Sequence, residues 1–164
     1  VTPVLQRQIG KVGVRGVEME GKVALNDRWN MTLAYSYWDS EIKEDGINGN
    51  VGKRPQRVPK NTASAWLDYT IPGDGWRGDL TLGGGVRYVG PTAGNDVNSF
   101  EVPAYTLADA AIRYDVGQIG STTVRLALNA SNLADKRFVS TCTGVSSCYY
   151  GSGRTVTATA TLGW

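Results

Sequence analysis

The chain has 164 residues, of which 41% are hydrophobic, and its formal net charge is +2. This length fits one domain or a piece of a larger protein, and the hydrophobic content excludes intrinsic disorder. So small a charge gives no reason to expect a nucleic-acid partner, and we predict none. No apolar run approaches the roughly 20 residues that a membrane helix needs.

Seven segments alternate apolar and polar residues with the two-residue period of a β-strand. In the last of them, Val156 and Leu162 share one face with the alanines between them, and the threonines from Thr155 to Thr161 share the other. Trp38 and Trp66 are exceptions, because they fall on polar faces. In chain order the segments are residues 16–25, 29–38, 63–71, 79–89, 105–115, 123–131 and 155–164.

The connections between these segments alternate in length. Short turns are expected at residues 26–27, 72–78 and 117–122, and long polar loops at about 40–60, 90–103 and 132–154. In an up-and-down meander, this alternation places all the short turns at one end of the sheet and all the long loops at the other. Outer-membrane barrels have this asymmetry, with short periplasmic turns and longer outer loops.

The polar faces of the strands carry full charges. In a transmembrane barrel the apolar face meets lipid and the polar face lines a wet lumen. A soluble, secreted β-sandwich used for adhesion also alternates, so it remains an alternative. We predict an all-β, antiparallel up-and-down meander of about seven strands that is part of a large transmembrane β-barrel. Its lipid-facing residues should include Met31, Leu33, Leu126 and Leu162, and its lumen-facing residues Glu20, Arg87, Arg113 and Thr159.

Four aromatic residues with apolar-face parity lie next to the predicted short turns or at the chain end: Trp29, Tyr69, Tyr114 and Trp164. Amphipathic rings in a row at one rim form the interfacial girdle of a membrane barrel. We therefore predict that these four residues lie at the membrane interface. The regular final strand is expected to close a barrel against the first strand, because unpaired backbone in lipid is costly.

Cys142 and Cys148 are the two cysteines, and glycine and serine lie between them. A zinc site would need more cysteine or histidine, and the chain has no histidine. The spacing favours a small disulfide loop over two free thiols, and a disulfide implies an oxidising compartment.

No motif supports catalysis or a protein-bound metal. Without histidine the common catalytic triads lack their base. The basic cluster Lys53, Arg54, Arg57 and Lys60 has two interpretations, a solvated loop or a contact with anionic lipid or an acidic ligand.

Five stretches in chain order resemble the C-terminal segments of TonB-dependent outer-membrane siderophore receptors, most of all the ferrichrome (hydroxamate) group. They are "RGVEMEGKVAL", "RVPKNTASAWLDYT", "VPAYTLADAAIRYD", "NLADKRFVSTC" and "CYYGSGRTVTATATLGW". The family fold is a plugged 22-stranded barrel. The resemblance implies that residues 1–164 are the C-terminal part of such a barrel, with the plug domain and the earlier strands absent.

The resemblance also implies a function. It predicts TonB-dependent uptake of a ferric siderophore of hydroxamate type across a bacterial outer membrane by a receptor that is not an enzyme. Iron would arrive as the chelate, so no cofactor is expected, and TonB would act through the absent plug. Cys142 and Cys148 match the family's outer-loop disulfide, and Tyr149 and Tyr150 match an aromatic pair of the same loop. We predict that these tyrosines contact the siderophore in the outer vestibule, and the alternative is that they pack in the loop or belong to an upper-rim girdle. Thr143 stands where the ferrichrome group has an aromatic ligand contact, so the exact siderophore is left open. A related receptor for haem, cobalamin or a glycan is an alternative.

Overall fold

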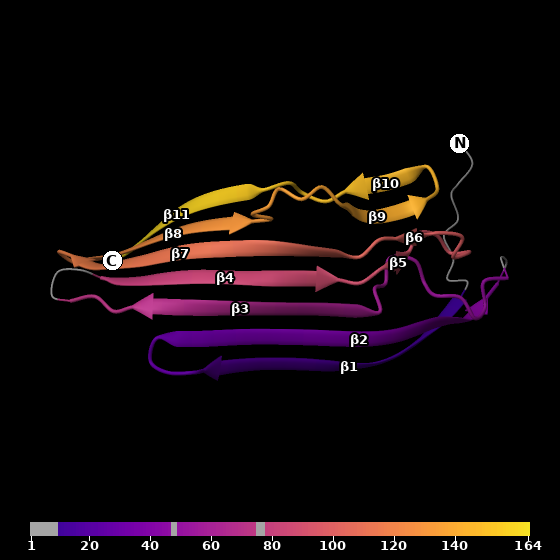
Figure 1. The fold of residues 1–164 in the computed structure, drawn as a ribbon, viewed down its shortest axis with the longest axis horizontal. Coiled ribbons are helices and arrows are strands. Elements are labelled where there is room, and N and C mark those ends of the chain that lie inside the picture. The colour runs from indigo at the N-terminus through magenta and orange to yellow at the C-terminus, as the bar shows by residue number, and fades with distance from the viewer. Residues whose placement is uncertain (1–9, 47–48, 75–77) are drawn as a thin grey trace.

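The computed structural model describes residues 10–46, 49–74 and 78–164, which form strands and connections (Figure 1). Seven long strands make one antiparallel sheet in the order β1-β2-β3-β4-β7-β8-β11. Their bounds are Gly10–Ala24 (β1), Trp29–Asp45 (β2), Asn61–Ile71 (β3), Asp79–Val89 (β4), Tyr105–Ile119 (β7), Thr122–Ser131 (β8) and Thr155–Gly163 (β11). Among the described residues, no helix is long and apolar enough to cross a membrane.

The predicted meander is confirmed, since every long strand pairs with the long strands that precede and follow it in the chain. The first two strands are longer than their hydrophobic pattern indicated, because β1 begins at Gly10 and β2 ends at Asp45. Lys11 pairs with Glu44 in this extension, and their side chains form an exposed ion pair at 3.8 Å. Val12 and Val14 of this extension have the parity of Glu18 and Glu20, so the apolar face does not continue there.

The two ends of the sheet differ as predicted. Figure 1 shows the short turns at the left and the long connections at the right, and we call the second end the outer end. Two small sheets within the long connections were not expected. They pair β5 (Thr92–Ala93) with β6 (Glu101–Val102), and β9 (Val139–Gly144) with β10 (Ser147–Tyr150). Residues 47–48 of the first long loop and 75–77 of the predicted turn 72–78 lie outside the described residues.

The strand register confirms the two predicted faces. Leu33, Ala65 and Val86 form one row across β2, β3 and β4, with apolar side chains on the same side. Leu33, Leu126 and Leu162 are 41%, 44% and 57% exposed, and no second sheet covers this face within the described ranges. The soluble β-sandwich is therefore wrong for this chain, because a sandwich buries these leucines between two sheets.

The strands β1 and β11 form the two edges of the sheet (Figure 1). Closure of the complete barrel by its final strand stays a prediction. Within the described ranges, β11 pairs only with β8 and β1 pairs only with β2, so the sheet keeps two open edges. The reason is geometric: seven strands make only an arc of a large barrel, so the two edge strands stay apart.

The apolar face gives a stability test at two leucines of similar exposure. Leu126 is 44% exposed in the middle of β8, whereas Leu133 is 40% exposed in the connection after β8. In the complete protein in phospholipid vesicles, Leu126→Arg should lower the free energy of unfolding by about 2–4 kcal/mol, because the charge enters hydrocarbon. Leu133→Arg should change it by less than about 0.5 kcal/mol. Denaturant titration measures both values, and equal losses would contradict a lipid-facing position for Leu126.

Candidate functional site

The outer end carries a disulfide hairpin. Cys142 in β9 and Cys148 in β10 form a disulfide with their Cα atoms 4.0 Å apart, which confirms the disulfide over two free thiols. Cys142 is only 2% exposed, so the β9 side of the hairpin is packed against the rest of the outer end. Among the residues that the structure describes, no group of three or more His, Cys, Asp or Glu side chains could hold a metal ion.

Arg57 joins the three long connections. Its backbone N–H donates to the carbonyl oxygen of Ala93 at 3.2 Å, and its Nε donates to the carbonyl oxygen of Cys142 at 3.3 Å. Its φ of 67° lies in the left-handed region that non-glycine residues seldom adopt. One residue of the first long connection thus contacts both the second connection and the disulfide hairpin.

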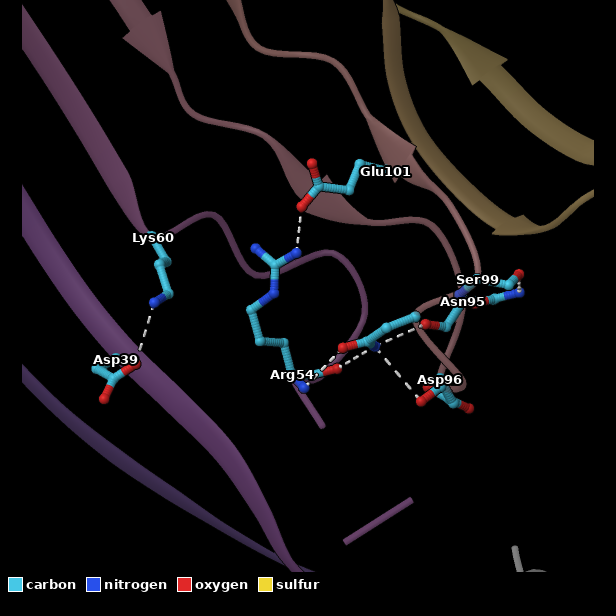
Figure 2. A network of polar contacts seen from close by, with 8 residues as sticks. Asp39, Arg54, Lys60, Asn95, Asp96, Ser99 and Glu101 are labelled. Atoms are coloured by element: carbon cyan, nitrogen blue, oxygen red, sulfur yellow. Dashed lines mark hydrogen bonds and ion pairs between the residues drawn. The ribbon is translucent and has the colours of Figure 1, made fainter. Parts of the chain in front are cut away.

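A second set of contacts joins the first and second long connections (Figure 2). The Arg54 N–H donates to Asn98 Oδ1 at 2.9 Å, and Asn98 Nδ2 donates back to the Arg54 carbonyl oxygen at 2.8 Å. The Arg54 guanidinium also forms an ion pair with Glu101, and Lys60 lies 3.5 Å from Asp39. These cations of the predicted basic cluster therefore have partners within the chain, which favours the interpretation as a solvated loop.

Asn132 holds the base of the last long connection. It is 2% exposed, and its φ is 52°. Its Oδ1 accepts from the Lys136 N–H at 2.9 Å, and its Nδ2 donates to the carbonyl oxygens of Lys136 and Ser152 at 2.9 and 3.0 Å. The side chain therefore ties both limbs of the connection, before and after the disulfide hairpin, to the end of β8.

An ion pair on the polar face continues this network. Arg87 Nε donates to Asp109 Oδ2 at 2.5 Å, and Arg87 Nη2 donates to Asp109 Oδ1 at 3.0 Å. Asp109 Oδ1 also accepts from the backbone N–H of Asn132 at 2.9 Å. The bidentate pair joins β4 to β7 and fixes both strands to the base of the last connection.

A cavity of about 460 Å³, which we call the outer recess, opens above this ion pair. The Phe138 ring in its wall lies between Tyr105 and Gly151: its centroid is 4.2 Å from that of Tyr105, and a Cβ added at Gly151 would overlap the ring. Its lining includes Arg87, Tyr105, Phe138, Ser140, Tyr150 and Gly151.

The two predicted ligand contacts lie next to each other in β10. Tyr149 is 59% exposed and Tyr150 is 77% exposed. Tyr150 lines the outer recess and Tyr149 does not. The two tyrosines therefore have different surroundings, although the sequence predicts the same role for both. Their contact with a ligand stays a prediction.

Glycines in neighbouring strands explain why Trp38 and Trp66 can occupy positions on the polar face. A Cβ at Gly83 would lie 2.7 Å from Trp66 Cζ2, and a Cβ at Gly85 would lie 2.5 Å from Trp66 Cε3. The indole therefore covers two glycines of β4, and its Nε1 donates to Asp68 Oδ1 at 2.9 Å. Trp38 likewise lies against a glycine of the neighbouring strand and donates from Nε1 to Glu18 at 3.1 Å.

The charges predicted for the lumen form cross-strand pairs. Arg113 Nη2 lies 2.6 Å from Asp68 Oδ1 across β4, and Arg125 Nε lies 2.8 Å from Asp115 Oδ1 in the neighbouring strand. These pairs stand on the face opposite the exposed leucines, as the alternation predicted.

The four predicted girdle residues lie near the short-turn end. Trp29 and Tyr69 are directly paired, and their ring centroids are 4.5 Å apart. Tyr114 pairs with Leu126 in β8, and Trp164 follows β11 with 97% exposure. Their place at a membrane interface stays a prediction.

Sequence reasoning missed Asn132, Phe138 and the outer recess. The stretch "SNLADKRF" after β8 contains two residues with positive φ, Asn132 and Asp135. Asparagine and aspartate are the residues that most often take this conformation, so the stretch indicates a tight turn. It gives no sign of the partner across the loop, Ser152.

The sheet is a one-layer meander with an uncovered apolar face, a charged opposite face and long connections at one end. These three features define the wall of a transmembrane β-barrel. The family model described as "TonB dependent receptor-like, beta-barrel" matches residues 2–133, and the chain belongs to this family. Membership places these strands in a bacterial outer membrane.

Relatives and solved structures agree with this assignment. The chain is 42% identical to the ferrichrome outer membrane transporter and phage receptor of Escherichia coli strain K12, over 93% of this chain and 20% of that protein. It is 39% identical to the ferrioxamine B receptor of Salmonella typhimurium strain SL1344, over 92% of this chain and 21% of that protein. The chain thus spans about a fifth of the length of these relatives.

Among solved structures, the fold is similar to BauA, the ferric preacinetobactin receptor of Acinetobacter baumannii. The TM-score is 0.80 and the identity is 25%, over 93% of this chain and 22% of that chain. The siderophore receptor PiuA of the same species gives a TM-score of 0.73 at 28% identity, over 92% of this chain and 22% of that chain.

The role of Asn132 can be tested with two variants. Asn132→Gly keeps the left-handed backbone accessible but removes the side-chain bonds to Lys136 and Ser152, so it should lower stability by about 1–3 kcal/mol. Asn132→Ala should cost about 1 kcal/mol more, because alanine disfavours positive φ. Unfolding in detergent measures stability, and limited proteolysis between residues 136 and 152 reports the loop. If both variants match the wild type in stability and cleavage, Asn132 does not hold the loop.

Proposed function

We propose that this chain is the C-terminal part of the barrel of a TonB-dependent outer-membrane receptor that takes up a ferric siderophore of hydroxamate type. The apolar face contacts outer-membrane lipid, and the four aromatic residues Trp29, Tyr69, Tyr114 and Trp164 anchor the short-turn end at the interface. An N-terminal plug domain outside residues 1–164 couples the barrel to TonB. The protein acts as a receptor and transporter, not as an enzyme, and it binds no nucleic acid.

The observation that supports this most is the outer end of the sheet. Its disulfide hairpin presents exposed tyrosines, Tyr149 and Tyr150, above a face that carries paired charges. Amphipathic rings suit a partly apolar iron chelate, because they offer both a ring face and a hydroxyl group. The relatives named for ferrichrome and ferrioxamine B favour a hydroxamate ligand. Iron arrives already coordinated by the siderophore, so the protein needs no resident cofactor.

Growth under iron limitation tests the proposal. A strain that depends on the complete receptor should grow on a ferric trihydroxamate and should stop growing when either the receptor gene or TonB is deleted. A ferric tricatecholate, haem, cobalamin and a glycan serve as comparison substrates. Uptake of haem, cobalamin or a glycan without uptake of the trihydroxamate would contradict the proposal and identify the alternative substrate.

The disulfide should matter more for binding than for stability. Its two cysteines are only six positions apart in the chain. In the chain-entropy model, removing the disulfide should therefore lower the free energy of unfolding by about 2–3 kcal/mol at most. The paired variant Cys142→Ser with Cys148→Ser should weaken ferric trihydroxamate binding to the receptor, because β10 and its tyrosines lose their fixed position. Fluorescence titration measures the affinity, and unchanged affinity would show that the disulfide does not position the ligand contacts.

A further inference from the structure

The outer recess lies on the polar side of the sheet. Arg87 and Leu107 pair directly between β4 and β7, and both line the recess. The recess is therefore open to the face that carries the ion pairs, directly below the disulfide hairpin that supplies Tyr150. At about 460 Å³ it has the size of pockets that hold small molecules.

The charge within the recess is balanced. Arg87 is the only cation among the described residues that line it, and Asp109 holds the guanidinium through two hydrogen bonds. The Asp109 side chain is only 13% exposed. Its carboxylate pairs with Arg87 and accepts a hydrogen bond from the N–H of Asn132. An anionic ligand would find no uncompensated positive charge there, whereas a neutral ligand would face no unpaired charge at all.

The lining suits a ligand with both apolar surface and oxygen atoms. The rings of Tyr105, Phe138 and Tyr150 supply flat apolar surface. Among the described residues, neither the Tyr105 hydroxyl nor the Tyr150 hydroxyl makes a hydrogen bond, and Arg87 uses only Nε and Nη2 toward Asp109. The two phenols and the remaining guanidinium N–H groups can therefore donate to ligand oxygen atoms.

A ferric ion bound by three singly charged hydroxamates is electrically neutral and presents its ligating oxygen atoms on its surface. A ferric ion bound by three doubly charged catecholates is strongly anionic. Resting on the proposed function, we infer that the outer recess is a contact site for a neutral ferric chelate. Tyr150 forms one of its walls, and the Arg87–Asp109 pair sets its preference for an uncharged ligand.

Two matched pairs of variants in the complete receptor test this site. Tyr150→Ala should weaken binding of a ferric trihydroxamate about tenfold, because it removes one wall. Tyr88→Ala changes a tyrosine on the apolar face of β4, outside the recess, and should weaken binding less than about twofold. Asp109→Asn keeps an oxygen that accepts from Asn132 but leaves Arg87 charged. It should raise the affinity for a ferric tricatecholate relative to the trihydroxamate about tenfold. Asp68→Asn frees Arg113 on the same face outside the recess and should leave this ratio unchanged.

Fluorescence titration with both chelates gives all the affinities. Equal effects of Tyr88→Ala and Tyr150→Ala would overturn the recess as the contact site, and so would equal ratio shifts for Asp109→Asn and Asp68→Asn. In either case, trihydroxamate binding by the wild type would still uphold the proposed function. A wild-type receptor that binds neither chelate would overturn both. The Asp109→Asn and Asp68→Asn comparison does not depend on Tyr150. If a variant of one pair folds poorly, the other pair of variants still decides whether the recess is the contact site.

Discussion

Backbone hydrogen bonding is the constraint on which the rest of this structure depends. A strand in the hydrocarbon layer must pair every N–H and C=O group within the protein. The seven long strands meet this demand by pairing in chain order, and their described pairings show register shifts at only two places, Lys11/Val12 and Asp115/Gly117. A register that shifts so little keeps each apolar row intact across the sheet, because a slip by one residue would turn every side chain to the other face.

The opposite face of the sheet carries the charges and two large indole rings, which must fit beside one another. The three arginines Arg87, Arg113 and Arg125 each lie against an aspartate of another strand, so the wall carries few unbalanced charges. Gly83 and Gly85 leave room for the flat ring of Trp66, and this is why a tryptophan occupies a polar-face position. Glycine in a strand often marks such a close approach.

The outer end shows how long connections acquire a defined shape without a large core. The buried apolar residues there, such as Ala93, Val102 and Cys142, are small. Hydrogen bonds from Arg57 and Asn132 replace hydrophobic packing and link the connections to one another and to the strand ends. The disulfide makes the hairpin itself rigid, whereas these bonds set its position relative to the polar face. Tyr150 therefore depends on both for its place in the outer recess.

The sequence by itself determined the seven strands, their two faces, the short and long ends, and the disulfide. These features follow from a two-residue period and from spacing along the chain, which are local properties. Only the tertiary structure decided the sheets β5–β6 and β9–β10, the outer recess, and the separation of Tyr150 from Tyr149. The two small sheets are local hairpins, which pair Thr92 with Val102 and Tyr150 with Val139. The contacts that position these hairpins join residues far apart, since Arg57 and Cys142 are separated by 85 positions and Arg54 and Asn98 by 44. No local pattern encodes such a partner, because the partner is selected only when the sheet brings the loops together.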